Sequence, residues 1–350
     1  MLAHHVRAAL VTIAALVLIT QSASASDSVN PYARAQQLVD VGNGRRLNLY
    51  CSGSGAPTVV LDAGLDGSSM YTWRKVQPLI AKHVRVCSYD RAGYGFSDPG
   101  VRPDDTSAHV EDLHALLHNA RVPGPYVLAA HSLGGFDARL YADRYRSEVA
   151  GMVLVAPEEL DENSFDAIYG KAKDDAYEAA YLKALRACAG QAHRHQLKLG
   201  GGCISRDPDP SIPAAVRRAH LKQALAAPVW DAMLSEFENA YDKNDAREVR
   251  AEQRDYGRLP FIVLTAAGEE NSGKADGATV AQDARANALL RRLRGADAAN
   301  SEIGVSCIVP GVVGEFIQTA RPNDVVNAVL DVVREVDAGA QARPRACHYF

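Results

Sequence analysis

The sequence predicts an α/β protein with a mostly parallel central sheet that is covered by helices on both faces. Short apolar segments recur along the chain and are expected to be buried strands, namely 45–50, 58–62, 84–89, 126–130, 152–156, 261–266 and 303–309. Helix-length segments with an apolar spacing of about 3.6 residues lie between them, as in 110–117 and 325–336. Continuously apolar strands that alternate with helices are typical of a parallel sheet.

The composition is that of a globular protein and excludes several other classes. The chain has 350 residues, 38 basic and 42 acidic side chains, and a formal net charge of −4. This balance leaves no basic stripe for nucleic acid, and the apolar content excludes a disordered chain. The cysteines show no spacing typical of a zinc site, so no metal and no other cofactor is expected.

The first 25 residues have the pattern of a secretory signal peptide. A weakly basic start is followed by the apolar run 8–19 and by small residues up to Ala25, after which cleavage is expected. The apolar run is shorter than the roughly 20 residues that span a bilayer. We therefore expect a secreted or periplasmic protein without a stable membrane span after cleavage.

Six cysteines follow the expected cleavage site, and an even number in an exported protein favours disulfides. Sequence alone leaves fifteen pairings open, and free, buried cysteines are a further alternative. The pairs that we expect are Cys188–Cys203, which share one insertion, and then Cys51–Cys87 and Cys307–Cys347.

One long interval interrupts the alternation of strands and helices. From 157 to 259 the sequence contains polar, Ala-rich helical segments and no convincing strand, which is too long for a loop. It is expected to form a helical cap over the sheet edge where ligands bind. The predicted units are a signal peptide (1–25), a first core part (26–157), a cap (158–259), a second core part (260–340) and a C-terminal tail (341–350).

The segment Ala130-His131-Ser132-Leu133-Gly134 carries the candidate nucleophile. It directly follows an apolar strand and opens a helical segment. A serine on such a sharp turn exposes its hydroxyl, and small residues two positions before and after it let the backbone approach. Ala130 and Gly134 meet this need, although a glycine is usual at the first position. The alternative is a serine that caps an ordinary helix.

Three motifs together resemble the α/β-hydrolase family. They are the segments 61–67 (LDAGLDG), 88–97 (SYDRAGYGFS) and 130–135 (AHSLGG). The resemblance covers about 44–336, interrupted by the cap, and implies a serine hydrolase. It also implies an oxyanion hole from the backbone N–H groups of Leu65 and Leu133. Asp90 to Gly95 is expected to shape the loop beside the site.

The resemblance implies an acid and then a histidine after the serine in chain order. The acid is expected after the predicted strand 152–156, where Glu158, Glu159 and Asp161 lie, or after the predicted strand 261–266. The candidates after the second of these strands are Glu269 and Glu270, and the sequence does not decide among these positions. For each acid, a solvated surface charge is the alternative.

The family's histidine position is occupied by a glutamate. Relatives carry Ser-Gly-His-Phe-Ile-Gln before a terminal helix, and the matching segment here is 313–318 (VGEFIQ), with Glu315 at the histidine position. A carboxylate with a reference pKa of about 4.3 is a poorer base for a serine hydroxyl than an imidazole at about 6.5. Loss of a triad base costs on the order of 10⁴ to 10⁶ in turnover.

Other histidines could replace the missing base. His131 is next to Ser132, but the turn is expected to direct it elsewhere. His193 and His195 lie in the cap, and His348 lies beside Cys347. A further group has helical spacing and is expected to face solvent, namely His109, His114 and His118.

Two hypotheses follow. In the first, the protein is an exported serine hydrolase that acts on carboxylic esters or related small acyl substrates. In the second, it is a catalytically silent hydrolase-fold protein that binds a small apolar ligand or a partner under its cap. Ser132 favours the first hypothesis and Glu315 favours the second.

Overall fold

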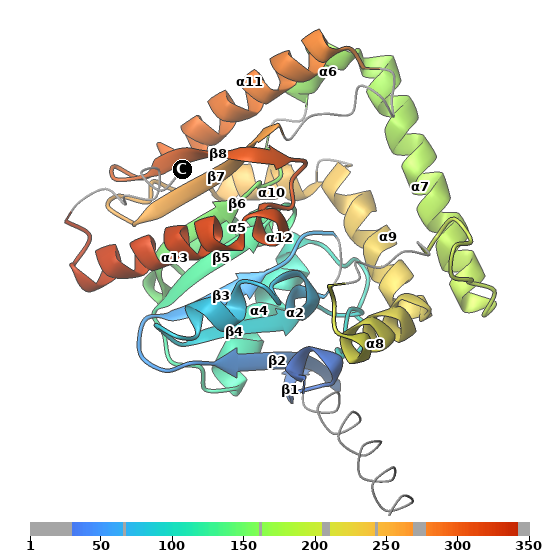
Figure 1. Cartoon of the computed structure of the whole chain (residues 1–350), viewed down its shortest axis with the longest axis horizontal. Coiled ribbons are helices and arrows are strands. Elements are labelled where there is room, and N and C mark those ends of the chain that lie inside the picture. Colours follow the sequence, from blue (N-terminus) through green and yellow to red (C-terminus); the bar gives the residue numbers. More distant parts are fainter. Residues whose placement is uncertain are drawn as a thin grey trace, which may run out of the picture.

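The computed structural model describes residues 30–65, 68–160, 163–204, 211–241, 244–268 and 278–341. Across these residues, one sheet of eight strands crosses the molecule in the order β1-β2-β4-β3-β5-β6-β7-β8 (Figure 1). The strands are β1 (Gln37–Gly42), β2 (Arg45–Ser52), β3 (Thr58–Asp62), β4 (Val86–Asp90), β5 (Tyr126–His131), β6 (Val149–Val155), β7 (Phe261–Gly268) and β8 (Val305–Val313). β1 and β2 pair antiparallel with their neighbours, and the pairs from β4 to β8 are parallel.

The seven predicted strands are confirmed, with ends that shift by a few residues. β1 was not predicted. It turns Val39 and Val41 toward the core, while the residues between and before them are exposed. Two inward apolar side chains in an otherwise polar segment give an alternation of apolar and polar residues that is too weak to predict a strand. A tight turn at Asn43, whose φ is +54°, then joins β1 to β2.

Successive side chains of the parallel strands point to opposite faces and build two cores. In β5, Leu128 and Ala130 belong to one core, whereas Val127 and Ala129 belong to the other. The first core includes residues of α4 (Thr106–Asn119), α5 (Gly134–Arg144) and α10 (Asn244–Glu252), and the second includes residues of α3 (Gln77–Ile80) and α13 (Pro322–Asp337). α11 (Val280–Ala298) packs against β7 and β8. The shorter elements are α2 (Ser69–Thr72), α12 (Ile317–Ala320), η1 (Pro31–Ala33) and η2 (Arg146–Glu148).

The insertion between β6 and β7 contains five helices in its described part. They are α6 (Asn163–Tyr169), α7 (Lys171–His193), α8 (Ala214–Ala224), α9 (Ala227–Tyr241) and α10. α7 and α9 pack together beyond the carboxyl ends of the strands (Figure 1) and enclose a small core of their own, with Leu185, Trp230 and Phe237 buried. α10 instead packs on α5. The exact limits of the cap, 158–259, stay a prediction.

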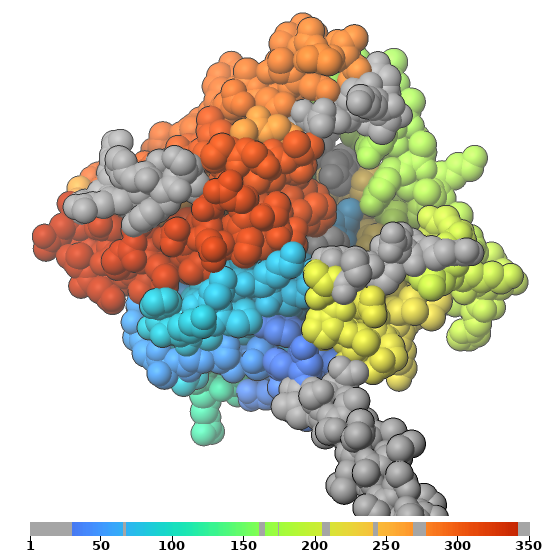
Figure 2. Space-filling model, viewed as in Figure 1, coloured from blue at the N-terminus to red at the C-terminus, as the bar shows by residue number. Residues whose placement is uncertain are grey.

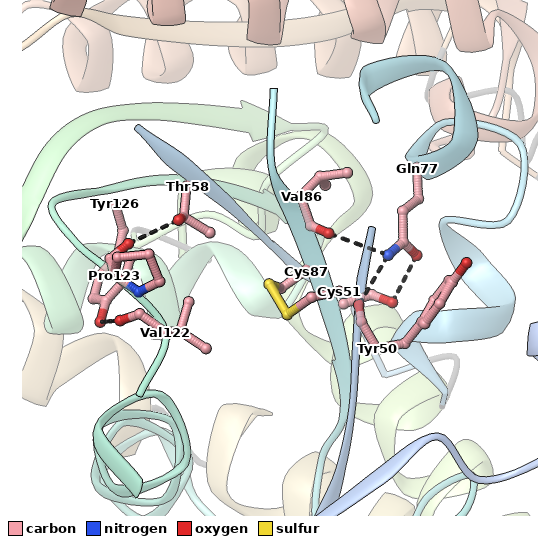
Figure 3. The surroundings of a disulfide bond; sticks show 10 residues. Tyr50, Cys51, Thr58, Gln77, Val86, Cys87, Val122, Pro123 and Tyr126 are labelled. Atoms are coloured by element: carbon pink, nitrogen blue, oxygen red, sulfur yellow. Dashed lines mark hydrogen bonds between the residues drawn. A yellow bond between two sulfur atoms is a disulfide. The ribbon is translucent and has the colours of Figure 1, made fainter. Parts of the chain in front are cut away.

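Two of the predicted disulfides are present. Cys188 joins Cys203 within the insertion, and Cys51 joins Cys87 across the facing strands β2 and β4. Beside the second bond, the Gln77 amide donates to the carbonyl of Tyr50 at 2.9 Å (Figure 3). The third predicted pair involves Cys347, and the predicted signal peptide covers 1–25, both outside the described residues. Within those residues, no helix is long and apolar enough to cross a membrane.

Candidate active site

Ser132 sits on a sharp turn between β5 and α5. Its φ of +50° lies in the left-handed region that side chains other than glycine rarely adopt. The backbone around it is held on both sides: its N–H donates to the Val155 carbonyl at 3.2 Å, and its own carbonyl accepts from Gly135 and Glu158 at 2.8 and 3.0 Å. A strained residue that its surroundings fix in this way is typical of an active site.

The loop after β3 approaches this turn closely. A Cβ atom on Gly64 would lie 2.8 Å from the Cβ of Ser132, and one on Gly134 would lie 2.4 Å from the Ala63 carbonyl oxygen. Both positions therefore require glycine. Leu65 lines the same cavity as Ser132, and Leu133 is buried at the start of α5. Each predicted oxyanion donor thus belongs to a segment beside the serine, while Asp66 and Gly67 lie outside the described residues.

Arg91 fixes the loop that carries Leu65. Its guanidinium is fully buried and donates to the backbone carbonyls of Ala63 and Gly64, at 2.5 and 2.7 Å. It also donates to Asp62 at 3.1 Å and, from Nε, to Glu236 of α9 at 3.0 Å. This agrees with the expectation that the segment 90–95 shapes the loop beside the site.

Glu236 is the partner from the insertion, and sequence analysis did not single it out. It also accepts from the Tyr94 hydroxyl at 2.8 Å, and Nε2 of His109 lies 3.3 Å away. Burial by itself would raise the pKa of Glu236, but the charge of Arg91 and the nearby ring of His109 lower it to about 2. A buried carboxylate of the insertion is therefore held ionised inside the core.

The expectation that His109 faces solvent is wrong. Its ring is buried between Asp137, at 3.2 Å, and Glu236. His118 is exposed and His114 is half-buried. The helical spacing placed His109 on α4 correctly, but nothing in the spacing shows that a carboxylate from a distant helix reaches that face.

A cavity of about 740 Å³ opens beside Ser132, between the insertion and the carboxyl ends of the strands. Figure 2 shows a recess between the green segment of α7 and the red C-terminal part of the chain. Its lining includes Leu65, His131 and Ser132 from the core, Tyr177 and Tyr181 from α7, and Glu315 after β8. Ser132 itself is 8% exposed, and no hydrogen bond to its hydroxyl occurs within the described residues.

Glu315 and His131 approach each other in this cavity. Oε2 of Glu315 lies 3.9 Å from Nε2 of His131. On the other side of the ring, a Cβ atom on Gly64 would lie 3.2 Å from Nδ1 of His131 and 3.3 Å from Oγ of Ser132. The expectation that the turn directs His131 away from the site is therefore wrong, because this side chain lines the cavity that also holds Ser132.

Glu158 and Glu159, the described candidate acids after β6, both line the cavity, but Glu159 is paired with an arginine. Glu159 is 5% exposed and accepts from Arg294 of α11 at 2.8 Å, and burial raises its pKa to about 7 against the charge of that arginine. Glu158 lines the cavity. The other candidate acids, Asp161, Glu269 and Glu270, lie outside the described residues.

The remaining candidate bases do not join the site. His193 contacts Asp231 at 3.0 Å on the surface, and His195 is exposed. Neither lines the cavity. His348 lies outside the described residues. Over the described part of the chain, no group of three potential metal ligands comes together.

Comparison with known proteins agrees with the topology. A family model for the α/β-hydrolase fold matches residues 57–198, which span the segment from β3 into α7. An esterase from Thermogutta terrifontis superposes with a TM-score of 0.57 at 18% identity, covering 87% of this chain and 99% of the esterase. The chain is an α/β-hydrolase-fold protein.

Sequence relatives of this α/β-hydrolase-fold protein match over short segments. An uncharacterized protein of Schizosaccharomyces pombe is 41% identical over 80 residues, which are 23% of this chain and 15% of that protein. The uncharacterized protein YqjL of Bacillus subtilis is 34% identical over 105 residues, 30% of this chain and 41% of its own length. The chain thus spans less than half the length of these relatives.

Proposed function

We propose that this protein is a serine hydrolase that cleaves carboxylic esters or related small acyl substrates. The observation that carries the proposal is Ser132, held at a φ of +50° with its side chain in a cavity of about 740 Å³. The close approach of the loop at Gly64 places the Leu65 segment beside it. The similarity in fold to an esterase supports the same chemistry.

In the proposed reaction, the Ser132 hydroxyl attacks the carbonyl carbon and its proton passes to the ring of His131. The backbone N–H groups of Leu65 and Leu133 stabilise the oxyanion, an arrangement worth several kcal/mol in serine hydrolases. The bond to the leaving alcohol then breaks, and the alcohol oxygen takes the proton. Water repeats the sequence on the acyl-enzyme and regenerates the serine.

Glu315 acts on His131 in this proposal. Its carboxylate lies 3.9 Å from Nε2, where it favours the imidazolium that forms during attack. In this proposal His131 is the base in place of the usual histidine after the last strand, and Glu315 takes the role of the acid that orients it. A glutamate at position 315 is then a positioning residue and does not serve as the base.

The test is labelling by a fluorophosphonate probe, compared between the natural chain and Ser132→Ala. We expect an adduct that requires Ser132. We also expect Glu315→Gln to slow labelling about tenfold and His131→Asn to slow it by about 10³-fold or more, because the base is lost. Melting curves identify a variant that has merely unfolded. Absence of any Ser132-dependent adduct on the folded protein would falsify the proposal.

A second candidate function has one observation in its favour. Ser132 makes no hydrogen bond to an imidazole within the described residues, and a glutamate occupies the position where the family has histidine. In this alternative, the protein is catalytically silent and binds a small apolar ligand or a partner in the same cavity. It predicts no probe adduct but saturable binding of an apolar fluorophore, which bulky substitutions at the cavity would block.

We further propose that the protein is exported to the periplasm or secreted, after cleavage following Ala25. Its two described disulfides are compatible with an oxidising compartment. Determination of the N-terminal residue of the mature protein tests the proposal. Ser26 is the expected first residue, whereas a mature chain that retains 1–25 would contradict cleavage.

A further inference from the structure

Helix α9 of the insertion packs against the loop that carries Leu65, the residue proposed as an oxyanion donor. The side chain of Leu65 contacts the first core of the sheet and also the small core of the insertion. Buried members of that small core include Trp230 and Phe237, which belong to α9. The loop is therefore held between the sheet and the insertion.

The backbone of the same loop is bound by Arg91. Its Nη1 donates to the Ala63 carbonyl at 2.5 Å, and its Nη2 donates to the Gly64 carbonyl at 2.7 Å. The Gly64 carbonyl and the Leu65 N–H belong to one peptide group. Because a trans peptide group is planar, its N–H points opposite to its C=O. The bond from Nη2 therefore also fixes the direction of the Leu65 N–H.

Glu236 of α9 orients the guanidinium that makes this bond. Its Oε1 accepts from Nε of Arg91 at 3.0 Å, and its Oε2 accepts from Nη2 at 3.2 Å. A carboxylate that binds two nitrogens restricts the rotation of the guanidinium as well as its position. Nη2 is thus shared between a carboxylate of the insertion and the Gly64 carbonyl of the loop.

Two carboxylates of the core also lie near Arg91, but both meet it at Nη1. Asp62 accepts from Nη1 at 3.1 Å, and Asp137 lies 3.8 Å from it. Burial raises the pKa of Asp62, which weakens it as a counter-charge. Burial would also raise the pKa of Glu236, but the charge of Arg91 is the chief cause that lowers it to about 2. Glu236 is therefore an ionised partner at the nitrogen that binds Gly64.

We infer that α9 positions the oxyanion hole through Glu236. Glu236 orients Arg91, and Arg91 holds the Gly64 carbonyl. The Leu65 N–H of that peptide group is thereby kept in one direction beside Ser132. Glu236 does not line the cavity, so it is a positioning residue. The inference rests on the proposed function and gives the insertion a part in the reaction.

The kinetic test uses the fluorophosphonate probe, whose phosphoryl oxygen occupies the oxyanion position during attack. The rate of labelling is measured over a range of probe concentrations for the natural chain and for Glu236→Gln. We expect the maximum rate to fall about tenfold or more, because loss of a whole oxyanion donor costs about 10² to 10³. The half-saturating probe concentration should change less than about threefold, since the donor acts on the charge that develops in the chemical step.

Two control variants exclude a general effect of lost charge or lost stability. Glu238→Gln makes the same chemical change on α9, at a carboxylate that pairs with Arg186 on the surface. Val249→Ala removes buried packing from α10 of the same insertion and lowers stability without altering a charge. Both should keep the maximum labelling rate within about twofold of the natural chain. An unchanged maximum rate in folded Glu236→Gln would overturn the inference.

Hydrogen exchange of the Ala63 N–H separates the inference from the proposed function. This N–H donates to Oγ of Ser69 at 2.9 Å, so its exchange reports whether the loop keeps its position. We expect exchange in Glu236→Gln to exceed that in Val249→Ala by about tenfold or more. Equal exchange in the two variants would overturn the inference. The measurement needs no reaction at Ser132, so it decides whether α9 holds the loop even if no adduct forms and the proposed function fails.

Glu236→Asp keeps the measurements decisive if Glu236→Gln does not fold. It retains the charge but shortens the side chain by one methylene, so the carboxylate can no longer reach both nitrogens of Arg91 in the same geometry. The maximum labelling rate should fall and the Ala63 N–H should exchange faster, in the same directions as for Glu236→Gln. A folded Glu236→Asp variant that matches the natural chain in both measurements would overturn the inference.

Discussion

Neutralisation of Glu236 tests whether the insertion is fastened to the core by the buried Arg91. A pKa depressed from 4.5 to about 2 means that the folded protein favours the charged carboxylate by about 3 kcal/mol. Glu236→Gln keeps the shape and removes the charge. We therefore expect it to lower the free energy of unfolding by about 3 kcal/mol at pH 7.

The pH dependence follows from the direction of the pKa change. A carboxylate whose pKa is lower in the folded state stabilises fully above its unfolded pKa, and this contribution is lost as the pH falls toward the folded value. The stabilisation by Glu236 is therefore complete above about pH 5 and declines below about 4.5. The cost of Glu236→Gln should accordingly shrink to about 2 kcal/mol at pH 3.5.

Urea unfolding followed by circular dichroism, with the disulfides intact, measures both values. Glu238→Gln is a matched control on the same helix, because its ion pair with Arg186 is largely exposed and should contribute less than about 1 kcal/mol. The reasoning is refuted if the two variants cost the same at pH 7. It is also refuted if the cost of Glu236→Gln is constant between pH 7 and pH 3.5.

Three further predictions concern the turn, the disulfide and the substituted base. Gly64→Ala should slow fluorophosphonate labelling by about 10²-fold, because its Cβ would displace the serine or the loop. The control is Gly295→Ala on α11, where a Cβ would meet open space. This control should leave labelling unchanged and raise the free energy of unfolding by up to about 1 kcal/mol. Replacement of both Cys188 and Cys203 by serine should cost about 3 kcal/mol, because the bond closes a loop of 15 residues, and limited proteolysis should then cut the insertion first. Glu315→His should lower ester turnover about tenfold, as Glu315→Gln lowers labelling, because the carboxylate that favours the His131 imidazolium is lost; a turnover above that of the natural chain would contradict this and indicate that a base is needed at position 315.

Sequence analysis predicted the centre of the sheet well because strands such as β3 and β5 are buried on both faces. Nearly all of their residues are apolar, and this leaves a clear signal. β1 has one face in solvent and only two inward valines, so its signal is weak. The turn at Ser132 was found because the glycine and serine spacing reports a local backbone conformation.

The surroundings of the serine were less predictable. The contact between His131 and Glu315 joins segments 184 positions apart, and only the fold brings them to within 3.9 Å. In the same way, Arg91 and Glu236 are separated by 145 positions. A charged residue in the sequence does not show whether its side chain is buried or which residue it pairs with. A buried, ionised carboxylate such as Glu236 therefore cannot be told from a surface acid by sequence alone.

Two neighbouring residues of α9 are hydrogen-bonded to the core, and this limits how the sequence of the insertion can change. Glu236 is committed to Arg91, and Ser235 accepts from the backbone N–H of Asp104 at 2.9 Å. α7 provides Tyr177 and Tyr181 to the cavity. Exchange of the insertion that includes α9 must therefore retain Glu236, or it removes one of the carboxylates that balance the buried Arg91 guanidinium and leaves the charge to Asp62 and Asp137.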